Sequence, residues 1–92
     1  GASAIVDGAG KVQGIFTDGD LRRRLEAGAD LRGATAAELM HGNPRTIAPD
    51  ALAVDAAALM ETHGITSVLV VDATGVLVGM VHIGDLMRAK VI

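Results

Sequence analysis

The sequence predicts an α+β fold built from two copies of one strand–turn–strand–helix unit. The main observation is that the chain matches itself when it is displaced by 65 positions. Apolar residues also fall on apolar residues between the identical positions, so each copy has two short apolar runs joined by an Asp-x-x-Gly turn. A self-match of this extent indicates an internal repeat. The identical pairs are Asp7 and Asp72, Gly10 and Gly75, Gly14 and Gly79, Gly19 and Gly84, Asp20 and Asp85, Leu21 and Leu86, and Arg23 and Arg88.

The first copy begins at the start of the chain. Its two apolar runs are strand-sized, and a helical pattern follows them with Leu21 and Leu25 four positions apart on one face. Gly28 is suited to end that helix. The expected elements are strands at about 4–6 and 12–16 and a helix at about 18–27.

The second copy is longer and begins with a linker. Thr35 and Glu38 have the spacing of a capping box, which predicts a short helix before the copy proper. In the last helix we expect Leu86 and Met87 to face inward, and the four methionines to fill the core. Gly64 is expected to close the long helix. The expected elements are helices at about 35–40, 53–62 and 84–90, and strands at about 45–47, 68–71 and 76–81.

A complete copy therefore has the order strand, helix, strand, strand, helix. The first copy lacks the leading strand and helix. We divide the chain into a first repeat at 1–34, shortened at its N-terminal end, and a second unit at 35–92 that holds the linker helix and second repeat. The two copies are expected to pack as pseudo-twofold partners, sheet against sheet.

The composition narrows the class of protein. The chain has 92 residues, half of them apolar, with one aromatic residue, no cysteine and a net charge of −3. No basic patch predicts binding to nucleic acid, and the apolar runs are too short to predict a membrane span. Three histidines, His41, His63 and His82, lack the spacing of metal ligands. We expect a cytoplasmic domain with no metal site and no catalytic residues of its own.

The first copy contains the candidate site, which begins at a helix start. The N–H groups and partial positive charge of a helix N-terminus suit a phosphate, and Thr17 would add a hydroxyl group. Asp20, one turn later, has two acceptor oxygens for the vicinal hydroxyls of a ribose, and Asp18 lies between them. An ordinary capping box explains the Thr-x-x-Asp spacing equally well without a ligand.

The second copy repeats the acid but not the hydroxyl residue. Asp85 corresponds to Asp20, whereas His82 stands where Thr17 stands in the first copy. Because histidine is a poor N-cap residue, we interpret His82 as a contact to a ligand or a partner subunit. The alternative is a half-exposed histidine at a strand end with no such role.

Further candidates lie where the two copies would face each other. Thr66 and Ser67 precede the central strand of the second copy and could read a nucleobase edge, or simply begin a strand. Arg45 could neutralise an anionic ligand, or be a solvated charge of the linker. The remaining candidates at this rim are Ser3, Ala4, Thr46 and Ile47.

The repeated pattern of an apolar strand, Asp-x-x-Gly, and then Gly-Ile-Phe-Thr-Asp-Gly-Asp-Leu resembles the CBS domain, named after cystathionine β-synthase. CBS domains occur in tandem pairs called Bateman modules, so the resemblance implies that the two copies form one such module. The nucleotide motif of the family is Gly-x-x-Thr/Ser-x-x-Asp, which Gly14, Thr17 and Asp20 match. Because His82 departs from this motif, the first copy is expected to hold the principal nucleotide site.

The segments 35–40, 65–68 and 82–89 sharpen this resemblance, because they are similar to the C-terminal CBS pair of bacterial D-arabinose 5-phosphate isomerases. That family places a sugar-isomerase domain before the pair, in the same chain. The domain converts ribulose 5-phosphate to arabinose 5-phosphate, the first step toward Kdo, a sugar of lipopolysaccharide. The resemblance thus implies a regulatory module whose catalytic partner is a domain outside these 92 residues.

The resemblance also implies a nucleotide ligand and no required cofactor. Adenine nucleotides are the usual ligands of the family, and CMP-Kdo or CMP is a second candidate because an activated end product suits feedback control. Two alternatives stay open. The module is a structural element that assembles homodimers or homotetramers, or it senses adenine nucleotides in another host protein.

Overall fold

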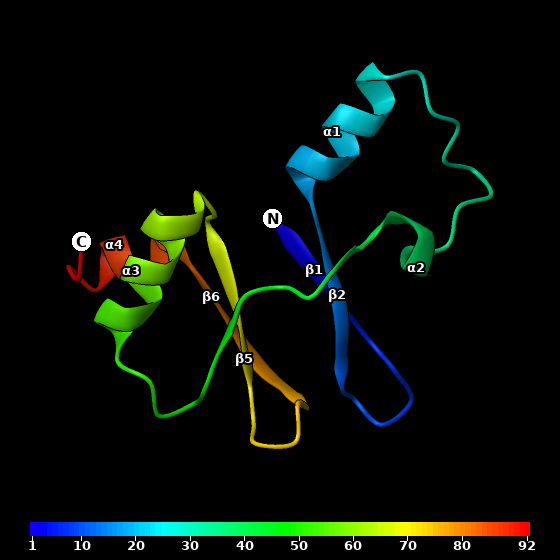
Figure 1. Cartoon of the computed structure of the whole chain (residues 1–92). Helices are drawn as coiled ribbons and strands as arrows, with labels where there is room; N and C mark the ends of the chain where they lie inside the picture. Colours follow the sequence, from blue (N-terminus) through cyan, green and yellow to red (C-terminus); the bar gives the residue numbers. More distant parts are fainter.

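The computed structural model describes residues 1–92 and has the expected α+β class. Two three-stranded sheets lie side by side, one in the order β1-β2-β3 and the other in the order β4-β5-β6 (Figure 1). The helices α1 and α2 flank the first sheet, whereas α3 and α4 lie at the far end of the second. The elements are β1 (Ala2–Val6), β2 (Val12–Thr17), α1 (Asp18–Glu26), α2 (Ala36–Leu39), β3 (His41–Gly42), β4 (Thr46–Ile47), α3 (Ala53–His63), β5 (Ser67–Val71), β6 (Leu77–His82) and α4 (Ile83–Arg88).

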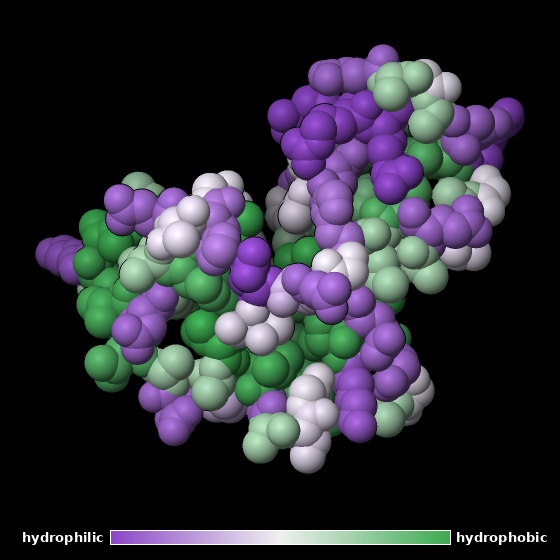
Figure 2. All heavy atoms as spheres, in the orientation of Figure 1, coloured by the Kyte–Doolittle hydropathy of each residue, from purple (hydrophilic) through white to green (hydrophobic).

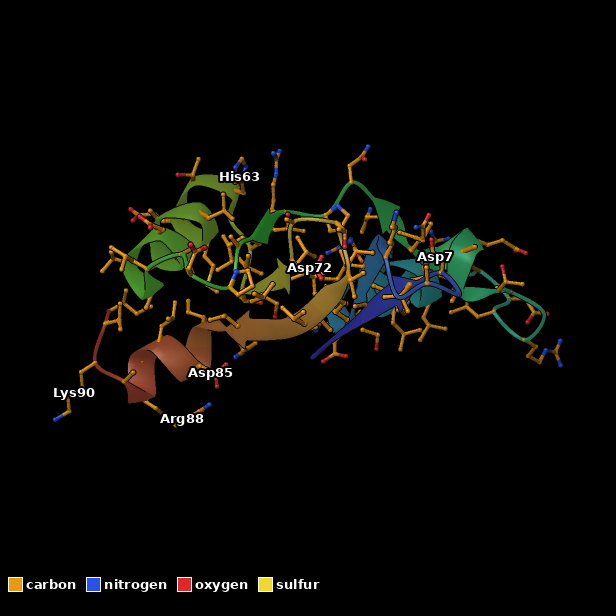
Figure 3. The ribbon with its side chains drawn as sticks, turned by 90° about the horizontal axis from the view of Figure 1, so that it is seen from below. Asp7, His63, Asp72, Asp85, Arg88 and Lys90 are labelled. Atoms are coloured by element: carbon orange, nitrogen blue, oxygen red, sulfur yellow. The ribbon has the colours of Figure 1, made fainter.

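The repeated aspartates form the turns of two equivalent hairpins. The pairs β1–β2 and β5–β6 are both antiparallel, and each has a register shift at its last residue before the turn. Asp7 Oδ1 accepts hydrogen bonds from the N–H groups two and four residues later, and Asp72 Oδ1 does the same. Gly10 and Gly75 have φ values of 82° and 87°, a region that glycine enters without steric cost. Figure 3 labels both aspartates in their turns.

The two hairpins meet at their turns around a pseudo-twofold axis. Lys11 and Val76 form an antiparallel bridge between the sheets. The Val12 N–H donates to Gly75 O at 3.0 Å, and the Leu77 N–H donates to Gly10 O at the same distance. Each donor and each acceptor is the counterpart of the other in the repeat, so the expected pseudo-twofold relation is confirmed.

The hydrophobic core belongs almost entirely to the second copy. Ala56 and Met60 of α3 pack with Val68 of β5 and Leu86 of α4. Leu69 is also fully buried, and its side chain leaves β5 on the opposite face from Val68 because strand residues alternate. In the first copy the buried residues are Gly14 and Asp20, neither of which is an apolar side chain.

Several apolar side chains are more exposed than expected. Leu86 is buried but Met87 is 60% exposed, because successive residues of a helix point about 100° apart and only one can face the sheet. Met80 is also exposed, so the expectation that all methionines fill the core is wrong. Leu21 and Leu25 share a face of α1, but the face is open to solvent.

The linker contains a strand that the sequence did not predict. The linker helix was expected to end at about residue 40, with no strand directly after it, whereas His41 and Gly42 form β3 and pair with Ile15 and Gly14 of β2. A third strand of the first sheet therefore comes from beyond residue 34.

None of the helices has the length and apolar character needed to cross a membrane.

Candidate functional site

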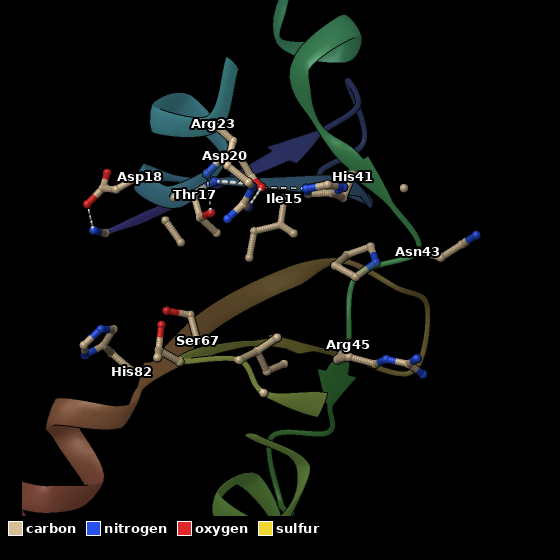
Figure 4. Close-up of a pocket in the computed structure, with 18 residues that line it drawn as sticks. Ile15, Thr17, Asp18, Asp20, Arg23, His41, Asn43, Arg45, Ser67 and His82 are labelled. Carbon is tan, nitrogen blue, oxygen red and sulfur yellow. Dashed lines mark hydrogen bonds and ion pairs between the residues drawn. The ribbon is translucent and has the colours of Figure 1, made fainter. Parts of the chain in front are cut away.

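A cleft of about 570 Å³ lies between the two copies, within the usual range for small-molecule sites. One wall is the end of β2 with the first turn of α1, and the opposite wall is the start of β5 with His82 at the end of β6 (Figure 4). The linker after β3 closes one side. In the space-filling view the molecule is hollowed between the part that contains α1 and the part that contains α3 and α4 (Figure 2).

Thr17 and Asp20 form a complete capping box at the start of α1. The Asp20 N–H donates to Thr17 Oγ1 at 3.2 Å, and the Thr17 N–H donates to Asp20 Oδ2 at 2.8 Å. The ordinary capping box, which the spacing allowed as an alternative to a ligand site, is therefore present. Thr17, which forms this cap, also lines the cleft.

The carboxylate of Asp20 is 5% exposed and is held by two further side chains. Arg23 Nη2 and His41 Nε2 each lie 2.6 Å from Oδ1. Burial alone raises the pKa of Asp20, but the hydrogen bonds from His41, Thr17 and Arg23 outweigh it and hold the pKa well below its usual range. The cleft therefore contains an ionised carboxylate whose two oxygens both accept hydrogen bonds.

Gly14 explains how His41 reaches Asp20. A Cβ atom at Gly14 would lie 2.5 Å from the carbonyl oxygen of His41 and 2.5 Å from the sulfur of Met40. Only glycine lets the linker strand β3 pack this closely on β2. The same contact places the His41 side chain over the start of α1, beside Asp20 (Figure 4).

In the second copy, no linker strand covers Asp85, the counterpart of Asp20. Asp85 pairs with Arg88 at 2.5 Å, as Asp20 pairs with Arg23, but its side chain is 50% exposed (Figure 3). A Cβ atom at Gly79 would meet nothing closer than 4.0 Å. The two motifs thus have the same local hydrogen bonds, but only the first is covered by the linker strand β3 and by His41.

His82 caps a helix, although histidine was expected to be a poor N-cap residue. His82 Nδ1 accepts a hydrogen bond from the Gly84 N–H at 3.0 Å, and Asp85 Oδ2 accepts from the His82 N–H at 2.9 Å. The imidazole therefore caps α4 through one nitrogen. Because Nδ1 is an acceptor, the neutral ring carries its proton on Nε2, and His82 also lines the cleft.

The structure gathers seven of the twelve candidate residues at the cleft. They are Thr17, Asp18, Asp20, Arg45, Thr66, Ser67 and His82. Ser3 is exposed outside it, because its neighbour Ala2 faces the cleft and strand residues alternate. Ala4 lies further along the strand, Asp85 lies outside the cleft, and Thr46 and Ile47 line a shallower groove beside Asp72.

Other cleft residues were not among the candidates. His41, Asn43 and Pro44 come from the linker, Arg23 from α1 and Ile15 from β2. Arg23 did have a signal in the sequence, because Arg22, Arg23 and Arg24 form a short basic run in the helix that begins at the proposed phosphate site. His41 had no local signal, because its contact with Asp20 spans 21 residues of sequence.

Comparison with known proteins identifies the family to which this architecture belongs. Residues 36–92, more than half of the chain, match the family model of the CBS domain. The chain belongs to the CBS domain family. The CBS domain pair of protein MJ0100, solved with 5′-methylthioadenosine and S-adenosyl-L-methionine, is 31% identical with a TM-score of 0.86, and the match covers 97% of this chain and 68% of that one.

Two further relatives of this CBS chain are a solved CBS domain protein and a longer enzyme that contains a similar segment. A CBS domain protein from Pyrobaculum aerophilum complexed with AMP is 27% identical with a TM-score of 0.88, over 99% of this chain and 71% of that one. The arabinose 5-phosphate isomerase KdsD of Salmonella typhi is 47% identical over the whole of this chain. This CBS chain spans only 28% of the length of that isomerase.

Proposed function

We propose that this chain is a Bateman module that binds a nucleotide between its repeats and regulates an enzyme domain of the same protein. Residues 1–34 would form the first CBS repeat, and residues 35–92 the linker helix and second repeat. One observation carries the proposal. The ionised Asp20 carboxylate is ordered and almost fully buried at the edge of a ligand-sized cleft that both copies line.

The chemistry of the cleft suits a ribose phosphate. Asp20 would accept hydrogen bonds from the ribose hydroxyls. The Thr17 hydroxyl and the N-terminal turn of α1 would bind the phosphate, since helix N-termini bind anions. Thr66 and Ser67 on the opposite wall would contact the base. Binding would regulate the enzyme only if two states of the protein bound the ligand unequally.

The parent protein is proposed to be a sugar-phosphate isomerase that makes arabinose 5-phosphate for Kdo and lipopolysaccharide biosynthesis. The 47% identity to KdsD over the whole chain supports this. Among ligands, CMP-Kdo suits feedback on the first step, with its carboxylate near Arg45 or His82. An adenine nucleotide is the competing ligand, and the AMP and S-adenosyl-L-methionine complexes of structural relatives support it.

The test is calorimetric titration of the 92-residue protein with CMP-Kdo, CMP, AMP and ATP. We expect at least one nucleotide to bind and Asp20→Ala to lose that binding. Asp85→Ala is the matched control, because it breaks the corresponding capping box and arginine pair outside the cleft. Absence of binding by all four ligands would refute nucleotide sensing. Equal loss in both variants would refute the assignment of the site to Asp20.

A second proposed role is assembly into homodimers or homotetramers. Large apolar side chains are exposed on three helices or their caps, among them Leu25 on α1, Leu52 and Val54 at the start of α3, and Met87 on α4. A second copy that covered these side chains would bury apolar area. Analytical ultracentrifugation with and without nucleotide tests this role. A monomer at all concentrations would refute it, and ligand-independent association without nucleotide binding would favour it over sensing.

A further inference from the structure

The Asp20 carboxylate already has partners on both oxygens. A carboxylate offers about four acceptor positions, two on each oxygen. Oδ1 accepts from Arg23 and His41, and Oδ2 accepts from the Thr17 N–H. One position on Oδ2 therefore remains. A single hydroxyl can bind there, but a vicinal diol that uses both oxygens has to displace one partner of Oδ1.

Of the two partners of Oδ1, His41 is the one that a diol displaces more easily. Arg23 is three residues away on the same helix and carries a fixed positive charge, and the Asp85–Arg88 pair repeats its geometry in the second copy. Exposure does not separate the two, because the His41 side chain is 64% exposed and that of Arg23 is 69% exposed. His41 differs in that it comes from the linker, 21 residues away in sequence, and carries no fixed charge. Its ring can rotate out of the cleft into solvent without moving α1.

We propose that His41 determines the specificity of the cleft by competing with a ligand diol for Asp20 Oδ1. This inference rests on the proposed nucleotide function and adds the residue that sets its affinity. A ribonucleotide engages both carboxylate oxygens with its diol only after His41 leaves Oδ1, whereas a 2′-deoxyribonucleotide, with one hydroxyl, uses only the free position on Oδ2. The strand β3 carries His41 and packs on Gly14. Displacement of His41 would therefore alter the packing of the linker between the repeats.

The experiment compares His41→Ala and His41→Val with the wild type by calorimetry. The probes are AMP, 2′-deoxy-AMP, CMP and 2′-deoxy-CMP. Valine is included because it keeps the strand preference of β3 if alanine destabilises it. His63→Ala is the matched control, an exposed histidine on α3 outside the cleft. The ratio of ribo to deoxy affinity is measured within each variant, so a loss of folded protein does not affect it.

Removal of His41 is expected to tighten ribonucleotide binding by roughly tenfold to a hundredfold, the worth of one hydrogen bond to a charged group, and to leave deoxynucleotide binding unchanged. Unchanged or weaker ribonucleotide binding would overturn the competition and leave the nucleotide function standing. Equal tightening for both sugars would also overturn it, because His41 would then only block the cleft. Absence of binding in the wild type and both variants would overturn the proposed function itself. Binding of ribonucleotides by the variants alone, with deoxynucleotide binding the same in wild type and variants, would support the competition.

Discussion

At the residue scale, Asp20 and Asp85 show how one motif acquires two environments. Both lie third in a helix, accept the backbone N–H of the capping residue, and pair with an arginine three positions later. His41 and the packing of the linker bury Asp20 to 5% exposure, whereas Asp85 stays 50% exposed. The pKa of both carboxyls is lowered against an opposing effect of desolvation, which is the largest single influence on Asp20 and ranks second for Asp85, after the hydrogen bond from the His82 N–H.

This environment predicts the pH dependence of stability. The folded-state pKa of Asp20 is lowered, so its contribution is fully present above the unfolded-state pKa of about 3.9 and is lost as the pH falls below it. Asp20→Asn should lower the free energy of unfolding by about 2 kcal/mol at pH 6, the worth of a hydrogen-bonded buried charge. The difference from wild type should shrink toward pH 2.5. Urea unfolding at the two pH values measures both differences.

Asp85→Asn is the control for this prediction. It removes the same local bonds from an exposed carboxylate, so its effect at pH 6 should be smaller. An effect of Asp20→Asn that is equally large at pH 2.5 and pH 6 would show that the charge of Asp20 is not what stabilises the fold.

At the element scale, the strand β3 makes the two copies different. It pairs with β2 directly over Gly14, and no strand lies over Gly79. The sequence showed both glycines as equivalent members of a repeat. The structure shows that the first is needed for close backbone approach and that the second is not.

A matched pair of substitutions tests this difference. Gly14→Ala should destabilise the protein by about 1–3 kcal/mol, because its Cβ would overlap backbone and side-chain atoms of the linker. Gly79→Ala should change stability by less than about 1 kcal/mol, because its Cβ would make only van der Waals contact. Thermal or urea unfolding of both variants measures the difference. Equal effects would show that β3 does not pack on Gly14 in solution.

At the scale of the whole molecule, stability is distributed unevenly. All five buried apolar side chains belong to the second copy. The strand β5 lies in the middle of its sheet beneath α3, whereas its counterpart β1 lies at an edge of the first sheet. Ser3, the counterpart of the fully buried Val68, is exposed. The first copy is therefore held mainly by its hairpin, the capping box and the linker.

Hydrogen exchange should report this asymmetry. Amides of β5 are expected to exchange more slowly than those of β1, by roughly tenfold or more, because an edge strand opens without breaking the core. Comparison of Val68 and Val70 with Ser3 and Ile5 by NMR measures it directly. Equal protection in the two strands would show that the copies open only together, as one cooperative unit.

The repeat, the hairpins, the threonine caps of α1 and α2 and the family resemblance follow from the sequence alone, because these depend on residues two to five positions apart or on a self-match along the chain. Asp7 and Asp72 make their turns with the N–H groups next to them, and Thr17 caps α1 within one turn. The three-dimensional packing was needed to show that His41 joins Asp20, that Thr46 and Ile47 lie outside the cleft, and that Leu25 and Met87 are exposed. These outcomes depend on contacts between distant segments and on which face of each element is covered, and no local pattern specifies either.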